Sequence, residues 1–347
     1  MLGVNNETGV FLNETLLGAE IKQANYRVKP GEFCYNPYRI NVGSIGLNEF
    51  DYDNQIISGA YVIFGTNESE LHPKFLGALF KSAQFLAYVN ERASGGVRMN
   101  FRFEHLEDWE ISLPSIDSQM CIVDEIDKLQ KMAMGAELIA DHFQIEVPEL
   151  LDYEPQPLAT VIAEIQNGLY KPGSDYGTGT PILRINDFGT GDTLTNLAEL
   201  KVVRLAKDEA ARFAIECNDI VLNRVNSLEH VGKVALVGEI QCACVYESNM
   251  MRLRVDTTRV LPTFVFRWLA SPRVAAKLKA KAKQAVNQFS VNQGDVGELL
   301  IPVPPLAEQS RIVAELDAKM KLLSDLRAMR EEAERAIRLT LDRIWEA

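Results

Sequence analysis

Polar and aromatic side chains crowd into two pairs of loops that stand at matched places in the two halves of the chain. The first pair is residues 35–46 with residues 223–233, and the second is residues 94–100 with residues 284–290. Arginine suits guanine edges, asparagine and glutamine suit adenine edges, and tyrosine and serine reach the backbone oxygens of a nucleic acid. Turn chemistry explains any one asparagine or glycine, but repetition at matched places favours a binding role. The candidates in these loops are Tyr38, Arg39, Asn41, Ser44, Arg98, Asn100, Arg224, Asn226, Asn287, Gln288 and Ser290.

The other reactive residue types form no catalytic site. Asn36-Pro37-Tyr38 resembles the Asn-Pro-Pro-Tyr signature of amino methyltransferases, but the second proline is absent and no glycine-rich turn follows a strand upstream. The glycine-rich stretches at 177–181 and 189–192 do not continue to Gly-Lys-Ser/Thr, so they are not phosphate loops. The histidines stand far apart without metal-ligand spacing, at 72, 105, 142 and 230. We therefore predict a non-catalytic protein that uses no cofactor and no metal.

Composition narrows the class of protein further. The five cysteines form no CxxC pair, and Cys242-Ala-Cys244 has no histidine nearby, so reduced thiols are a better interpretation than a zinc site. No apolar run approaches the length of a membrane span, and the N-terminus lacks the basic and apolar regions of a signal peptide, so we expect a cytoplasmic protein. A net charge of −12 argues against bulk attraction to nucleic acid, but it allows a local basic face.

The matched loops need a scaffold that repeats, and the sequence contains one. The stretch IPVPPLAEQSRIV at 301–313 has a degraded copy, ISLPSIDSQMCIV, at 111–123, with a constant offset of 190 residues. Upstream of these stretches, residues 71–82 align with 261–271 and residues 28–36 with 215–223, at offsets that drift only from 187 to 190. Because this period is far too long for a solenoid repeat, it indicates two copies of a whole domain.

Each copy ends in a strand, a proline-rich turn and a long amphipathic helix. Prolines cannot continue a sheet ladder, so Pro302, Pro304 and Pro305 end a strand, and we predict a helix from about Leu306 almost to the C-terminus. The earlier helix spans about 118–143 and carries the same apolar seam. We expect the two seams to pack against each other as an antiparallel coiled coil. In the second helix the seam consists of Ile312, Leu316, Met320, Leu323, Leu326, Ala333, Ile337, Leu341 and Ile344.

The globular part of each copy has a mixed α/β pattern. Residues 60–65 and 233–238 are typical of short strands, and residues 260–284 predict a helix whose periodicity breaks at Ser271-Pro272. That helix is the most basic piece of the chain, and Lys279 is a candidate for phosphate contact, although a solvated helix face explains the charges equally well. The opening of the second copy, at 157–188, has no counterpart in the first, so we expect the first domain to be incomplete at its start. Either the chain is a piece of a longer polypeptide, or something else completes its first domain.

Three stretches together resemble the specificity subunit of type I restriction-modification systems. They are IPVPPLAEQSRIVAELD with its earlier echo, FCYNPYRINVGSIG, and IQNGLYKPGSDYGTGTPILRINDF. The resemblance implies two target recognition domains that alternate with two conserved helical regions. The expected boundaries are 1–114 for the first recognition domain, 115–147 for the first helical spacer, 148–303 for the second recognition domain and 304–347 for the second spacer. The third stretch adds Tyr170, Lys171, Tyr176 and Arg184 to the candidate DNA contacts.

The resemblance also implies a function and a set of partners. The chain would be a non-catalytic subunit that recognises a bipartite sequence in double-stranded DNA and positions two DNA adenine methyltransferase subunits, together with restriction and translocase subunits. Similar two-domain specificity regions occur in restriction enzymes of the type IIB and IIG kinds, so the type of assembly stays open. An alternative is an adaptor or inhibitor that binds the methyltransferase without reading DNA. Selection of bound DNA from a random duplex pool, with and without the methyltransferase partner, distinguishes these two hypotheses.

Overall fold

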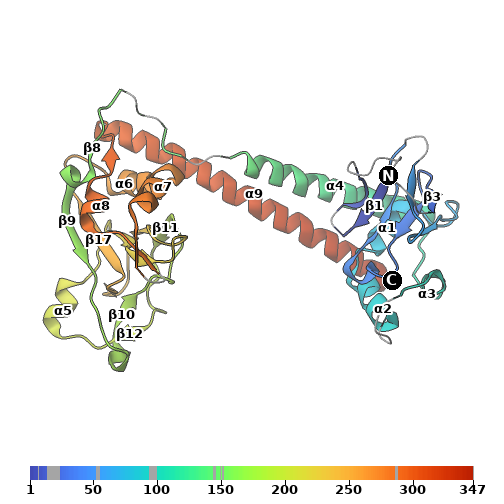
Figure 1. Ribbon diagram of the computed structural model, residues 1–347, viewed down its shortest axis with the longest axis horizontal. Coiled ribbons are helices and arrows are strands. Elements are labelled where there is room, and N and C mark those ends of the chain that lie inside the picture. Colours follow the sequence, from blue (N-terminus) through green and yellow to red (C-terminus); the bar gives the residue numbers. More distant parts are fainter. Residues whose placement is uncertain are drawn as a thin grey trace. The chain divides into compact units, whose positions relative to one another are not determined.

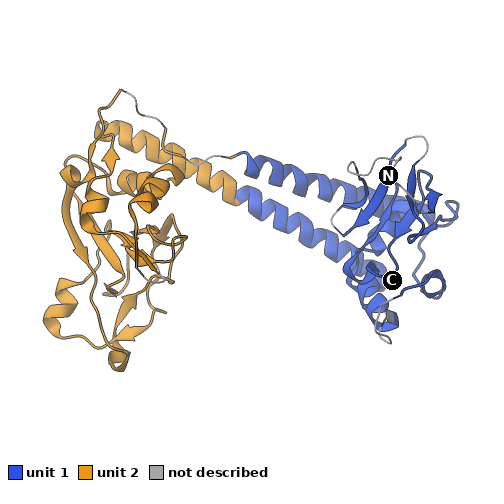
Figure 2. Cartoon of the chain, in the orientation of Figure 1, with its two compact units in different colours: residues 1–142, 325–347 blue, residues 143–324 orange. Residues whose placement is uncertain are grey.

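The computed structural model describes every residue except 7, 14–23, 52–54, 94–99, 144–145, 149, 151, 286–287 and 347, together with the side chains of 93, 285 and 346. The chain divides into two compact units, coloured blue and orange in Figure 2. Unit 1 comprises residues 1–142 and 325–347, and unit 2 comprises residues 143–324. Both units mix helices and strands, as the sequence predicts, and α9, Leu306–Glu346, contributes residues to both (Figure 1).

Unit 1 is built on a small antiparallel sheet with the strand order β5-β4-β7. Its central strand is fully buried, and the helix α1 begins with a proline, whose fixed φ suits the first turn of a helix. The elements are β1 Leu2–Asn5, β2 Gly9–Leu12, β3 Asn25–Arg27, β4 Phe33–Tyr35, η2 Ile40–Val42, β5 Ile45–Leu47, β6 Ile56–Ser58, β7 Val62–Phe64, α1 Pro73–Leu79, α2 Ala83–Ala93, α3 Phe103–Glu107 and α4 Ile116–Asp141.

Unit 2 contains a five-stranded sheet with the strand order β11-β15-β13-β17-β9, in which only the β11 and β15 pair is parallel. Its elements are β8 Gln156–Pro157, η3 Leu158–Val161, β9 Ile162–Asn167, η4 Gly173–Asp175, β10 Tyr176–Leu183, β11 Asp192–Leu194, β12 Val202–Val203, α5 Lys207–Arg212, β13 Ile220–Asn223, β14 Val225–Asn226, β15 Val234–Val237, β16 Val245–Tyr246, β17 Met250–Val255, α6 Pro262–Ala270, α7 Pro272–Lys281, β18 Lys283–Ala285, β19 Gln288–Ser290, α8 Gln293–Gly297 and β20 Leu300–Ile301.

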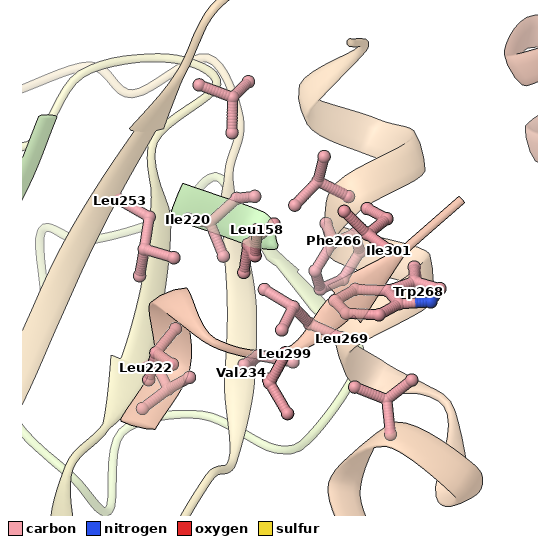
Figure 3. Close-up of a cluster of buried hydrophobic side chains, with 14 of the residues drawn as sticks. Leu158, Ile220, Leu222, Val234, Leu253, Phe266, Trp268, Leu269, Leu299 and Ile301 are labelled. Carbon is pink, nitrogen blue, oxygen red and sulfur yellow. The ribbon is translucent and has the colours of Figure 1, made fainter. Parts of the chain in front are cut away.

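The main core of unit 2 lies between the five-stranded sheet and α6. Figure 3 shows part of it, where Phe266 and Leu269 of α6 lie in one cluster with Leu253 of the sheet. Each fully buried side chain of this size contributes about 1.5–3 kcal/mol relative to an exposed one. The predicted break at Ser271-Pro272 is confirmed, because α6 ends at Ala270 and α7 begins at Pro272.

The predicted duplication is visible in the geometry of both units. The central strand β4 pairs with β5 and β7, and β13 pairs in the same antiparallel manner with β15 and β17. A buried glutamine at the start of each long helix makes the same three hydrogen bonds. Gln119 donates to Glu70 O and Pro114 O and accepts from His72 N. The counterpart of Gln119 in unit 2 is Gln309, which donates to Arg259 O and Pro304 O and accepts from Leu261 N.

Within unit 1 the helix α4 and the last part of α9 run antiparallel. Glu125 accepts a hydrogen bond from Thr340 at 3.2 Å, and Glu137 accepts one from Arg330 at 2.8 Å, so residue order reverses between the helices. Beneath these bonds lies an apolar cluster that includes Val123, Ile126, Leu341 and Ile344. The predicted antiparallel packing of the seams therefore holds for residues 325–346.

The first part of the α9 seam has a different role from the predicted one. Ile312 and Leu316 are buried in the core of unit 2, in the cluster that contains Phe264 and Leu299. Periodicity predicts correctly that these positions are covered, but it does not say by which surface. The expectation that they belong to the coiled-coil seam is wrong, because the core of unit 2 itself covers them.

Candidate nucleic-acid interface

The two loop pairs selected from the sequence meet in space in unit 2. The strand β14 pairs with β19, which places Asn226 opposite Phe289 and Val225 opposite Ser290. Val291, the residue after β19, extends the pairing, because its backbone N donates to Arg224 O at 2.9 Å. The small sheet β14-β19-β18 therefore gathers four of the candidates from two separate loops, namely Arg224, Asn226, Gln288 and Ser290.

Two arginines of this site are held by the turn between β16 and β17. Arg224 donates through Nη1 to Ser248 O at 3.1 Å, and its own amide donates to Asn249 O. Arg184 forms an ion pair with Glu247, with 3.5 Å between Nε and Oε2. The side chain of Arg184 is 36% exposed and that of Glu247 is 13% exposed, so solvent screens the charge of this pair in part. The turn thus contacts two arginines, Arg184 just after β10 and Arg224 between β13 and β14.

Several polar atoms of the site are buried without a hydrogen-bond partner among the described residues. They include Asn223 Oδ1, Arg224 Nε and Arg184 Nε. Asn223 is 0% exposed and uses its amide nitrogen for Ile185 O, at 3.2 Å. An unpaired buried polar atom costs about 1–3 kcal/mol, so such atoms concentrate where a ligand or ordered water completes the bonding. The site therefore has unused donors and an unused acceptor.

Lysines of unit 2 divide into free and neutralised ones. Lys279 is exposed at its amino group, which donates to Glu229 O at 2.7 Å, a bond that leaves two N–H groups for a phosphate. Lys233 donates to Ile185 O and lies 4.7 Å from the centre of the Phe188 ring, and burial lowers its pKa. Lys171 is different, because its amino group lies 2.6 Å from Glu209 Oε2 and its side chain is only 14% exposed. Its charge is thus used within the unit.

Two tyrosines complete the described surface. Tyr170 is 78% exposed and follows Leu169, which bridges to Glu247. Tyr176 is half-buried, and burial followed by the charge of Glu247 raises its pKa, so its hydroxyl stays protonated and can donate. An exposed aromatic ring can stack on bases or contact sugars in nucleic-acid complexes.

The matching end of unit 1 is built in the same way. Phe101 N donates to Pro37 O at 2.9 Å, which is the counterpart of the bond between Val291 and Arg224. Tyr38 and Arg39 are exposed beside that bond, Asn41 is half-buried in η2, and Asn100 is exposed immediately before Phe101. The structure therefore brings the two loops of unit 1 together as well.

Ser44 departs from the expectation of a DNA contact. It is buried, and its hydroxyl donates to Val4 O at 3.0 Å. This bond fastens the loop to β1, so the Ser44 hydroxyl is not accessible to DNA. Arg98 and Asn287, two further candidates, lie outside the described residues.

Sequence reasoning did not select Asn223, Lys233 and Glu247. Asn223 and Lys233 lie in the selected loop at 223–233, but their orientation depends on Ile185, which is distant in sequence. Glu247 could have been selected from the sequence, because it belongs to a polar turn at 247–249 that separates two runs typical of strands. Among the described residues no three histidine, cysteine or carboxylate side chains gather as metal ligands, and no helix there is long and apolar enough to cross a membrane.

Known proteins resemble this chain in sequence and in fold. A family model, the type I restriction modification DNA specificity domain, matches residues 162–334. A protein of Methanocaldococcus jannaschii that is described as a type I restriction enzyme MjaX specificity subunit is 32% identical over 181 residues, which are 52% of this chain and 40% of that protein. The type I restriction enzyme EcoKI specificity subunit of Escherichia coli K12 is 22% identical over 273 residues, which are 70% of this chain and 57% of that protein. The chain thus spans less than two thirds of either relative.

A solved structure agrees with the fold. This structure concerns complex assembly and conformational transition of the type I R-M system. The alignment covers 95% of the present chain and 85% of the chain in that structure. The TM-score is 0.55 at 21% sequence identity, which supports a shared fold. The predicted class, a recognition subunit rather than a catalytic one, is confirmed at the level of the family. The DNA specificity domain at residues 162–334, the named relatives and the duplicated architecture lead to one conclusion: the chain belongs to the family of type I restriction-modification specificity subunits.

Proposed function

We propose that this chain recognises a bipartite DNA sequence, with one half-site read by each unit, and that it positions adenine methyltransferase and restriction subunits on that DNA. The observation that carries the proposal is the repeated junction of two loops. In unit 1 it is closed by Phe101 and Pro37, and in unit 2 by Val291 and Arg224. The scaffold at the junction is the same in both units, whereas the exposed side chains differ. Two different surfaces on one scaffold suit two different half-sites.

The chemistry of the unit 2 junction supports base reading more than simple attraction. A guanidinium group presents donors in a fixed fork that matches the major-groove edge of guanine. Asn226 and Gln288 carry amides that suit the edge of adenine. Lys279 offers a point charge for a phosphate at the margin of the site. With a net charge of −12 the whole chain repels DNA, so attraction has to come from such local groups.

The proposed partners rest on the relatives and on the helices. The names of the relatives describe subunits of type I restriction enzymes, and the solved structure concerns assembly of such a system. In unit 1 the helix α4 exposes apolar side chains, including Met134, Leu138 and Ile139, which a docked subunit would cover. Two methyltransferase subunits would follow from two copies of the domain.

Selection from a random duplex pool tests the proposal. The purified chain is incubated with the pool, with and without an adenine methyltransferase subunit, and the bound DNA is sequenced. We expect enrichment of two short conserved blocks separated by a gap of fixed length. Enrichment of no sequence, while the methyltransferase still binds the chain, would favour an adaptor that does not read DNA and would contradict the proposal.

A further inference from the structure

Unit 1 contains an apolar slot beside the open edge of its sheet. The slot has a volume of about 260 Å³ and lies between β7, α1 and α3. Among the described residues β7 pairs only with β4, so its other edge carries no strand. The residues that line the slot are Phe64, Gly65, Thr66, Asn67, Leu71, Leu76, Phe80, Phe103, Leu106, Glu107, Trp109 and Ile111.

The same place in unit 2 is filled by residues 156–167. The segment begins with β8, which pairs with β20, continues through η3 and ends in β9, which pairs with β17. Leu158 and Val161 of η3 are both 0% exposed, and Figure 3 shows Leu158 in one cluster with Leu299 and Ile301. Leu158 N donates to Leu299 O at 2.7 Å, and Asp256 N donates to Val161 O at 2.8 Å.

The walls of the two slots correspond residue by residue. Leu71 N donates to Asn67 O in unit 1, and Val260 N donates to Asp256 O in unit 2. Trp109 N likewise donates to Leu106 O, as Leu299 N donates to Val296 O. Asn67 N and Trp109 O therefore occupy the places of the two backbone groups that hold η3. Neither group has a hydrogen bond within the part of unit 1 that the structure describes.

Apolar side chains that are fully buried in unit 2 have counterparts in unit 1 that are only half-buried. Ile301 and Val296 are each 0% exposed, whereas their counterparts Ile111 and Leu106 are only half-buried. The hydroxyl of Thr66 is buried without a partner among the described residues. Its counterpart is Val255, which pairs with β9. The slot thus combines uncovered apolar surface with unpaired backbone groups, which is the chemistry that binds an added strand.

The charge at the rim of the slot differs from the charge at the equivalent place in unit 2. Glu107 stands where unit 2 has Gly297, and a β-carbon at Gly297 would lie 3.2 Å from the β-carbon of Ala159. Glu70 stands where unit 2 has Arg259, whose guanidinium group bonds to Thr160 O. Two carboxylates therefore replace a glycine and an arginine beside the turn of the bound segment. An occupant of this slot needs a basic residue at that turn.

We propose that the slot of unit 1 binds an extended polypeptide segment outside residues 1–347. The segment carries apolar residues at the places of Leu158 and Val161 and a lysine or arginine between them. It adds an antiparallel strand to β7 and covers Trp109 and Ile111. The slot is a polypeptide-binding site separate from the proposed DNA-reading loops, so it can be tested without DNA.

A labelled peptide with the sequence of residues 154–168 tests this site on the full 347-residue chain. Fluorescence anisotropy is used to compare that peptide with its Ala159→Lys form and with a form that carries Leu158→Asp and Val161→Asp. We expect saturable binding of the first two, with the lysine form about two- to five-fold tighter, and no binding of the third. Hydrogen exchange should show new protection at residues 62–64 and 109–111.

Charge reversal in the chain provides the matched control. Glu107→Lys should abolish the preference for the lysine peptide, whereas Asp108→Lys, the same change at the next exposed residue, should retain it. No saturable binding of either peptide, or new protection confined to unit 2, would overturn the proposal. Dimerisation of the chain that the peptide reverses would show that a second copy fills the slot, and this too would overturn it.

Discussion

The buried glutamine at the start of α9 provides a sharp test of how the helix is attached to the rest of unit 2. Gln309 is 0% exposed. Its amide nitrogen donates to Arg259 O at 3.0 Å and to Pro304 O at 2.8 Å. Its amide oxygen accepts from Leu261 N at 2.7 Å. Gln309→Leu keeps a side chain of similar size and removes all three bonds.

The expected loss follows from those three bonds. Each lost bond to one of these buried or part-buried backbone groups costs about 1 kcal/mol, so Gln309→Leu should destabilise unit 2 by about 3 kcal/mol. By the relation of about 1.4 kcal/mol to a tenfold change, opening of the unit becomes about a hundredfold more frequent. Native-state hydrogen exchange resolves this change for peptides of unit 2 and separately for peptides of unit 1.

Two further variants make the result specific. Ser310→Leu adds the same side chain at the next, exposed residue of α9 and should change exchange little. Gln119→Leu should produce the same loss in unit 1, since Gln119 makes the equivalent bonds. Exchange that rises less than tenfold after Gln309→Leu, or rises equally after Ser310→Leu, would refute the view that this side chain joins helix and domain.

Three further predictions follow from burial and charge. Leu316→Asp places an unpaired charge in the core of unit 2 and should destabilise the unit by about 3–5 kcal/mol in urea unfolding. An unchanged unfolding midpoint would show that Leu316 does not lie in this core. Lys279→Ala should weaken binding to all DNA sequences and reduce the salt slope by about 1, whereas Lys171→Ala should do neither, because its charge is already paired; equal effects would contradict this division. Cys121 is exposed and should react with Ellman's reagent at pH 8, whereas burial raises the pKa of the Cys34 thiol to about 12 and should protect it; rapid reaction of both would show an open core.

Local chemistry was enough to predict much of the fold. The predicted helix starts at Leu306 because three prolines precede it, and α9 begins there. The break at Ser271-Pro272 and the duplication also follow from residues that are neighbours in the sequence or stand at a constant offset. Such signals do not depend on tertiary contacts, so they can be recognised before the structure is known.

The failed expectations involve partners that are distant in sequence. Ser44 is engaged by Val4, and Lys171 is engaged by Glu209, so neither side chain is available in the way its type suggests. Ile312 lies on a correct apolar seam but packs into unit 2. Residue type and periodicity predict that a group needs a partner, whereas the three-dimensional fold decides which partner it obtains.

The central claim is that each unit reads one half of a bipartite DNA site, and base-resolved selection tests it most directly. The sites selected by the unmodified chain are compared with those selected by Arg224→Ala, in unit 2, and by Arg39→Ala, in unit 1. Loss of one base-reading contact costs about 1–3 kcal/mol, so each change should relax positions in one half-site only, and the two should affect opposite halves. Relaxation of the same half by both changes, or an unaltered site in both, would contradict the account.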